Sequence, residues 1–213
     1  MNKREFVKHI KELLELNDFK SVGVGAGSVS LVKGDEEIII SYNKYPDQFV
    51  LPPAFTGRKC FPQVEDILEK YFTSHEINYG RNTIYYNSRR VEDLQIRTIE
   101  DVKDFSKILP DLNEMVYSDI LPFFEDHGTL ELVHDKIDQL EVSELSKFIV
   151  SPVHPRIMVI KRLVNACGWE SYCEESIKMY KEQSEGKYKA VFEPIYRFLP
   201  DLFKELKENG HPE

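Results

Sequence analysis

Apolar residues recur first at helical spacing and then at alternating positions along the chain. An amphipathic helix is predicted over residues 2–16, where one face carries the apolar side chains of Phe6, Val7, Ile10, Leu13 and Leu14. Alternation follows in Ser28–Lys33 and in Glu36–Tyr42, with Gly34-Asp35 between them. Two alternating runs joined by a two-residue turn predict a β-hairpin.

The next stretch, residues 43–62, is rich in proline and predicts an extended loop that packs down through its aromatic residues. Pro62 stands at a favourable first helical position and predicts a helix over residues 63–72. Residues 83–86 and 94–99 contain β-branched and aromatic residues and predict two further strands.

From residue 100 onward the apolar spacing is helical. Helices are predicted over residues 100–126, 130–140, 156–166, 170–183 and 188–208. The first of them contains Pro110 and Pro122, which should kink or split it.

Strands therefore run together in the first half and helices in the second, which predicts an α+β fold. We expect a mostly antiparallel sheet of about four strands in the N-terminal half, packed against a helical C-terminal half. A single domain over residues 1–213 is predicted, with a possible subdivision into 1–99 and 100–213.

Charge is distributed unevenly along the chain. The formal net charge is −9, but residues 1–99 contain 14 basic and 14 acidic side chains, so the whole excess belongs to residues 100–213. Such a surface repels nucleic acid and anionic membranes and attracts a basic protein partner. The alternative is a solvated helix face that aids solubility. Candidate partner-binding residues on the predicted helix 170–183 are Glu174, Glu175 and Glu182.

No apolar run approaches the ~18 residues of a membrane span, and charges interrupt the N-terminal segment too often for a signal peptide. The three cysteines are an odd and sparse set, which favours reduced thiols and a cytoplasmic location. Cys167 and Cys173 are separated by five residues, which is unlike structural zinc pairs, so we expect buried structural cysteines and no metal site.

Familiar catalytic and cofactor motifs do not occur. The glycine-rich stretch 23–27 follows a predicted helix and opens a strand, whereas a dinucleotide fingerprint follows a strand and opens a helix. It is interpreted as a flexible connection. The six histidines show no metal-binding spacing. We therefore expect no cofactor and assign no catalytic residue.

One cluster combines arginines with tyrosines over the two later strands. Its candidate ligand-binding members are Arg81, Tyr85, Arg89, Arg90 and Arg97. Arginines beside aromatic rings can hold phosphates or stacked bases. The balanced charge of this half and the acidic second half argue against nucleic acid, which leaves an anionic small ligand or an acidic protein patch. The structural alternative is a strand face with tyrosines packed inward and arginines in solvent.

The segment Ile120-Leu121-Pro122-Phe123-Phe124-Glu125 is followed by a short helix with Thr129 as its N-cap. In this layout the chain resembles small uncharacterised bacterial proteins that begin with a helix and a hairpin. Some of those proteins are suspected immunity factors beside secreted toxins. The resemblance implies a binding role and carries over no functional residue.

Three functions stay open. The first is a non-catalytic protein-binding or immunity-like factor that uses an acidic helical face against a basic partner. The second is a small-anion-binding protein or enzyme, with a site formed by the 43–62 loop and the Tyr/Arg cluster. The third is a structural subunit of a homodimer that associates through the aromatic C-terminal helix. The sequence predicts no oligomeric state.

Overall fold

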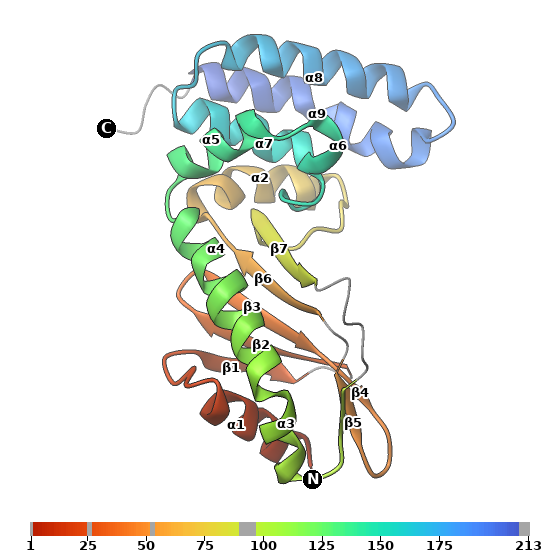
Figure 1. Cartoon of the computed structure of the whole chain (residues 1–213). Coiled ribbons are helices and arrows are strands. Elements are labelled where there is room, and N and C mark those ends of the chain that lie inside the picture. The colour runs from red at the N-terminus through yellow and green to blue at the C-terminus, as the bar shows by residue number, and fades with distance from the viewer. Residues whose placement is uncertain (1, 25–26, 52–53, 90–96, 209–213) are drawn as a thin grey trace. The chain divides into compact units, whose positions relative to one another are not determined.

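The computed structural model describes residues 2–24, 27–51, 54–89 and 97–208. The α+β class predicted from the sequence is confirmed: antiparallel sheets dominate the N-terminal half and helices the C-terminal half (Figure 1). Contacts divide the chain into two compact units, each built from two segments. Unit 1 comprises Met1–Lys59 and Tyr85–His127, and unit 2 comprises Cys60–Ile84 and Gly128–Glu213. These boundaries differ from the subdivision at residue 99 that the sequence suggested.

Unit 1 contains almost all of the strands. Its elements are α1 (Lys3–Leu13), β1 (Lys20–Val24), β2 (Ser28–Lys33), β3 (Glu36–Ser41), β4 (Asn43–Lys44), β5 (Phe49–Leu51), β6 (Ala54–Lys59), β7 (Ile84–Arg89, whose first residue belongs to unit 2), β8 (Arg97–Ile99), α3 (Val102–Asn113), the π-helical segment η1 (Glu114–Ile120) and α4 (Leu121–Asp126). One sheet has the strand order β1-β2-β3-β6-β7 and a smaller one the order β4-β5-β8.

The predicted hairpin is confirmed. Strands β2 and β3 pair antiparallel, and Lys33 lies opposite Glu36 on either side of the turn. Gly34 adopts a positive φ of 58°, which a glycine tolerates without steric cost.

Four strands, β1, β4, β5 and β6, were not predicted. The interpretation of residues 23–27 as a flexible connection was wrong for residues 23 and 24, which belong to the edge strand β1 that pairs with β2; residues 25 and 26 lie outside the described part of the chain. The loop interpretation of residues 43–62 was also wrong, because β4, β5 and β6 lie within it and β6 pairs with β3 inside the larger sheet. An edge position tolerates the glycine of β1, and Pro46 and Pro62 fall between elements or at a helix start, where they do not interrupt the ladder.

One face of the larger sheet is buried. The alternating burial of β2 and β3 places Val29 opposite Ile40 and Leu31 opposite Ile38. The next strand continues these rows, with Phe55 beside Ile40 and Gly57 beside Ile38. Because side chains alternate across a strand, this register buries the whole apolar set on one face.

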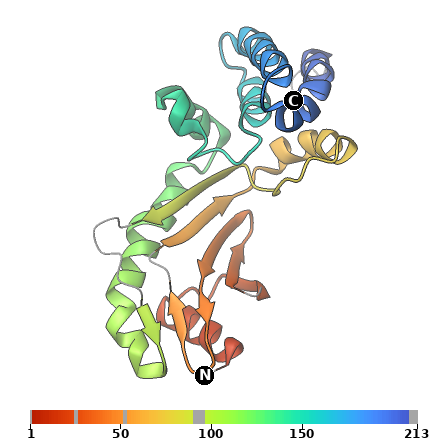
Figure 2. The ribbon, with the colours of Figure 1, turned by 90° about the vertical axis from the view of Figure 1, so that its right-hand side faces the viewer.

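Helices α3, η1 and α4 follow one another as a rod that crosses the sheet (Figures 1 and 2). The predicted kinks at Pro110 and Pro122 were only partly right. Pro110 lies inside α3, and the irregularity comes later as η1, where the N–H of Leu121 donates to the carbonyl of Val116 in the wide π-type spacing. Pro122 then occupies the first turn of α4.

The rod approaches β6 most closely at Gly57. A Cβ atom at this position would lie 2.9 Å from Cγ2 of Ile120 in η1 and 3.4 Å from the ring of Phe124 in α4. The absence of a side chain therefore allows the rod to lie directly on the sheet.

A second buried cluster joins α1 to the smaller sheet. Phe6 stacks on Phe49 at 4.4 Å between ring centroids and contacts Tyr42 edge-on at 5.3 Å and Phe105 of α3 at 5.7 Å. The predicted N-terminal helix is confirmed, and its N-cap Asn2 forms a capping box with Glu5.

Unit 2 is mainly helical. Its elements are α2 (Pro62–Ser74), α5 (Leu130–Gln139), α6 (Val142–Leu145), α7 (Val153–Leu163), α8 (Trp169–Ser184) and α9 (Lys189–Glu208). The longest pair, α8 and α9, lie side by side (Figures 1 and 2), and α2 packs against α7. The helices predicted in this region are confirmed with shifted ends, and α6 was missed. Among the described residues, no helix is long and apolar enough to cross a membrane.

We expect Gly57→Ala to destabilise the protein by about 1–3 kcal/mol, because overpacking at this contact forces η1 or β6 to shift. Urea denaturation followed by circular dichroism measures the change. The control is Gly80→Ala, where a Cβ atom would meet nothing within 4 Å. Equal stability of both variants would contradict the close-packing explanation.

Candidate functional site

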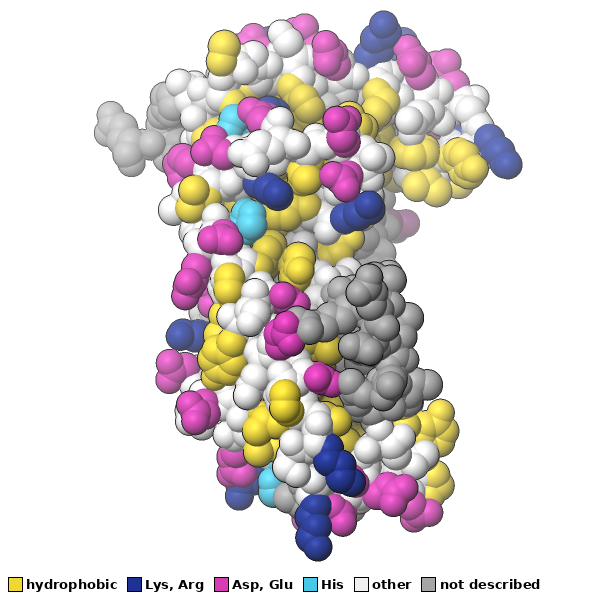
Figure 3. Space-filling model, in the orientation of Figure 1, with side chains coloured by type: hydrophobic (Ala, Val, Ile, Leu, Met, Phe, Trp, Pro, Cys, Tyr) yellow, Lys and Arg dark blue, Asp and Glu magenta, His cyan; other side chains and the backbone are white. Residues whose placement is uncertain are grey.

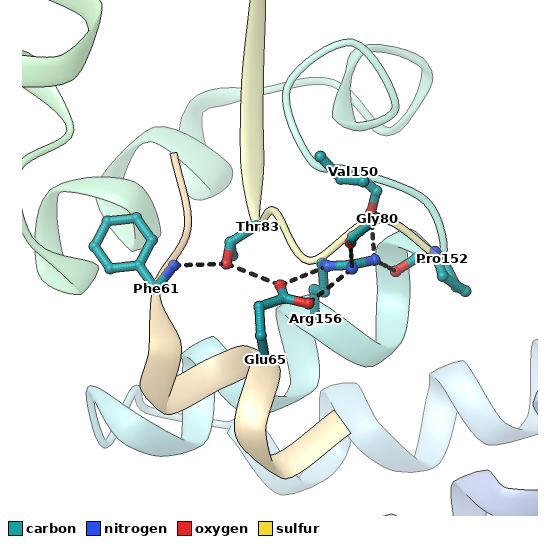
Figure 4. A network of polar contacts seen from close by, with 7 residues as sticks. All are labelled: Phe61, Glu65, Gly80, Thr83, Val150, Pro152 and Arg156. Carbon is teal, nitrogen blue, oxygen red and sulfur yellow. Dashed lines mark hydrogen bonds and ion pairs between the residues drawn. The ribbon is translucent and has the colours of Figure 1, made fainter. Parts of the chain in front are cut away.

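The most enclosed charged cluster lies in unit 2, where Glu65 of α2 meets Arg156 of α7 (Figure 4). Both side chains are fully buried. The guanidinium binds the carboxylate in a bidentate manner, with Nε to Oε1 and Nη2 to Oε2 both at 2.8 Å. Two parallel bonds of this kind give both strength and orientation.

Surrounding groups complete this network. Nη1 of Arg156 donates to the carbonyls of Val150 at 3.0 Å and Pro152 at 3.4 Å, and Nη2 also donates to the carbonyl of Gly80 at 2.9 Å. The Thr83 hydroxyl donates to Glu65 at 2.8 Å and accepts from the N–H of Phe61 at 3.0 Å.

All five N–H donors of the Arg156 guanidinium therefore have acceptors within the protein. Neither charged group is exposed, so the network offers no open position for a ligand. Its role is to tie α2, α7 and the segments around Gly80 and Val150 together. Sequence reasoning missed it because an isolated Glu and an isolated Arg separated by 91 residues give no local signal.

A second polar group in unit 2 is His154 of α7, which is half-buried. Its Nδ1 lies 2.7 Å from the hydroxyl of Tyr172, and its ring meets that of Tyr180 edge-on at 5.8 Å. Burial lowers the pKa of His154 and raises the pKa of Tyr180 to about 12. Both groups are therefore neutral at pH 7, and the cluster packs α7 against α8.

The three cysteines differ in exposure. Cys173 is buried, as expected, and burial raises the pKa of its thiol to about 12. Cys167 is exposed, so the expectation of burial was wrong for this residue, which lies in the turn before α8. Within the described residues, no group of three or more potential ligands could hold a metal ion.

The predicted Tyr/Arg cluster is divided between the two units. Arg81 belongs to unit 2, where its guanidinium forms ion pairs with Asp66 and, at 2.8 Å, with Glu69; these charges, Asp66 first, raise its pKa. Tyr85 belongs to unit 1 and is half-buried.

The remaining members of the cluster are less defined. Arg89 and Arg97 have described backbones in β7 and β8, while their side chains lie outside the description, and Arg90 lies outside the described residues altogether. The same hypothesis placed the other wall of the anion site in the 43–62 loop. Near that loop, Tyr42 is buried in the aromatic core and Arg58 lies 3.8 Å from Glu37. The anion site at this cluster stays a prediction.

The predicted acidic residues of α8 are exposed. Glu174, Glu175 and Glu182 lie on the face opposite the buried residues of this helix, and among the described residues none of the three forms an ion pair.

The acidic excess is not confined to one unit. Unit 1 contains 14 basic and 18 acidic residues and unit 2 contains 14 and 19, net charges of −4 and −5. Acidic side chains accordingly occur over both units on the face shown in Figure 3.

Unit 1 contains a groove of about 440 Å³ that the sequence did not reveal. We call it the acidic groove. Its lining residues come from the turn after α1, the β2–β3 hairpin, η1 and α4: Glu15, Leu16, Asp18, Phe19, Lys33, Glu36, Tyr117, Leu121, Phe124 and Glu125. No local pattern could have predicted a site assembled from three separate stretches of the chain.

Apolar side chains form the base of the acidic groove. Leu16, Phe19 and Phe124 are at most 4% exposed, so they present only small apolar surfaces that belong to the core. Tyr117 is 45% exposed, and its hydroxyl donates to the carbonyl of Leu14 at 2.5 Å, which ties η1 to the end of α1. Desolvation and the nearby Glu15 carboxylate raise the pKa of Tyr117.

The rim carries four carboxylates and one lysine. Lys33 lies 3.4 Å from Asp18, and Glu36 is held by Lys59 at 3.2 Å, which also donates to the carbonyl of Phe124. Glu15 and Glu125 form no ion pair among the described residues, and both are exposed. The rim therefore has an uncompensated negative charge above an apolar base, which suits a cation with an aliphatic body.

We expect Arg156→Met to destabilise the protein by about 3–5 kcal/mol, because it leaves the Glu65 carboxylate buried without its partner. The double variant Glu65→Met/Arg156→Met should cost less than the sum of the two single changes. Chemical denaturation of the four proteins gives the coupling energy. Arg81→Met, which removes an exposed cation, is the control and should cost no more than about 1 kcal/mol. Additive effects at Glu65 and Arg156 would contradict the network described above.

We also expect His154 to make stability depend on pH. Its pKa in the folded protein is below the value of about 6.5 that it regains on unfolding. The unfolded chain therefore binds the proton first, and stability falls as the pH is lowered through the unfolded value and down to the folded one. Unfolding midpoints measured between pH 8 and 5 should fall less steeply for His154→Gln than for the parent. Parallel curves would contradict this assignment.

The acidic groove thus combines an apolar base with two carboxylates, Glu15 and Glu125, that form no ion pair among the described residues. Comparison of the chain with protein-family models, with curated proteins and with solved structures found no match.

Proposed function

We propose that this protein is a binding factor for a basic protein and that a lysine or arginine side chain of the partner enters the acidic groove. The observation that carries the proposal is the combination of an apolar base with the two unpaired carboxylates Glu15 and Glu125. An aliphatic stem of arginine or lysine packs on apolar surface while its charged head remains at the polar rim.

The overall charge supports this assignment. Both units are net negative, so a basic partner would be attracted from a distance whichever unit it approaches. The exposed carboxylates Glu174, Glu175 and Glu182 on α8 would add to this attraction. An inhibitor or immunity-type factor is one kind of protein that works in this way.

The proposal is tested with a defined probe. A fluorescently labelled peptide of alternating arginine and leucine should bind the full chain, measured by anisotropy, and binding should weaken as NaCl is raised from 50 to 500 mM, since salt screens exposed charges. The same peptide with glutamate in place of arginine should not bind.

We expect Glu15→Gln/Glu125→Gln to weaken binding of the arginine peptide roughly three- to thirty-fold, because each exposed ion pair contributes about 0.3–1 kcal/mol. The matched control is Glu174→Gln/Glu175→Gln, which removes the same charge from α8. A larger loss in the control would place the binding face on α8 instead, and no loss in either variant would contradict the proposal.

A further inference from the structure

A second groove, of about 410 Å³, lies in unit 1 beside α1. We call it the basic groove. Its lining residues are Arg4, Val7, Lys8, Lys11, Glu12, Asn17 and Ser21. Helix α1 provides the first five of them, and the turn after α1 and the start of β1 provide Asn17 and Ser21.

The three cations share one side of α1. Positions 4, 8 and 11 are four and three residues apart, which places their side chains one above the other along two turns. Val7, which also lines the groove, is 7% exposed and belongs to the buried side of the helix. The cations therefore stand at the border between the packed face of α1 and solvent.

The positive charge of the groove is only partly neutralised. Glu12 lies 3.6 Å from Lys8 and 3.8 Å from His9. Arg4 and Lys11 form no ion pair among the described residues. Three cations and one carboxylate give the groove a net charge of +2 within a unit whose net charge is −4.

Screening limits the influence of the acidic residues elsewhere. The Debye length is about 8 Å at physiological ionic strength, so exposed carboxylates beyond that distance act weakly on the groove. The local charge therefore decides what the groove binds, and it favours an anion despite the net charge of the whole protein.

The geometry also suggests the size of the anion. At a rise of about 1.5 Å per residue, Arg4 and Lys11 are roughly 10 Å apart along the helix. This span exceeds a single phosphate and matches two or three linked ones. The exposed amide of Asn17 and hydroxyl of Ser21, which also line the groove, add neutral donors from outside the helix.

We propose that the basic groove binds a small molecule carrying two or more phosphate groups. Arg4 and Lys11 bind its two ends, Lys8 binds between them, and Asn17 and Ser21 donate hydrogen bonds. The site is separate from the acidic groove and does not depend on the function proposed above.

Isothermal titration calorimetry of the full chain with inorganic phosphate, pyrophosphate and tripolyphosphate tests the proposal. Tripolyphosphate should bind at least tenfold more tightly than phosphate, and Arg4→Gln/Lys8→Gln/Lys11→Gln should abolish this preference. The matched control, Lys103→Gln/Lys178→Gln/Lys181→Gln, removes three exposed lysines elsewhere and should leave it unchanged. Equal affinity for the three anions, or an equal loss in the control, would overturn the proposal.

The variant Glu12→Gln should change the affinity for tripolyphosphate in the opposite direction. Removing the one carboxylate of the basic groove releases Lys8, so tripolyphosphate should bind about threefold more tightly. A merely solvated helix face would show no such gain, and weaker binding would also count against the site. In a parallel arm, sedimentation with phosphatidylserine vesicles separates a soluble ligand from a membrane surface: binding to vesicles without binding to tripolyphosphate would overturn the assignment.

Discussion

The contact between η1 and β6 at Gly57 determines how unit 1 is built. A glycine in an otherwise apolar row lets Ile120 approach the sheet backbone, and the rod of α3, η1 and α4 lies across the sheet as a result. The acidic groove depends on this contact, because Tyr117, Leu121 and Phe124 come from the same rod. The core contact between Ile120 and Gly57 thus positions the acidic groove, which begins about one helical turn away along the rod.

The wide turns of η1 have a similar effect. A π-type segment shifts the residues that follow it relative to a regular helix, and such segments often occur at functional sites. Here the segment carries Tyr117, whose hydroxyl is fixed to the end of α1 and whose ring lines the acidic groove. The irregularity therefore contributes to the groove and to the attachment of the rod.

The sequence predicted those parts of the fold that local periodicity governs. The hairpin of β2 and β3 and the long helices follow from the spacing of apolar residues. Prediction from the sequence failed for β1 and β6, because glycine and neighbouring prolines suppress the local signal of a strand. These two strands are stabilised by pairing with β2 and β3, respectively. The acidic groove was not predicted, because it is lined by residues from segments that meet only in the folded chain. The basic groove was not predicted either, because helical spacing places its cations on one side of α1 without showing that a cavity lies beside them. The same holds for Glu65 and Arg156, which are unremarkable as single residues and form a complete network only when α2 and α7 pack together.

The two units are interleaved along the chain, and this has a consequence for synthesis on the ribosome. Helix α2 emerges early, yet the guanidinium that neutralises Glu65 belongs to residue 156, and helix α9, which also contacts α2, is later still. Unit 1 has all of its segments once residue 127 has emerged, so it can fold first. Before Arg156 has been synthesised, burial of α2 would leave the Glu65 carboxylate without its partner, which is unfavourable. The charge therefore keeps the exposed α2 segment soluble and delays its burial until α7 has been made.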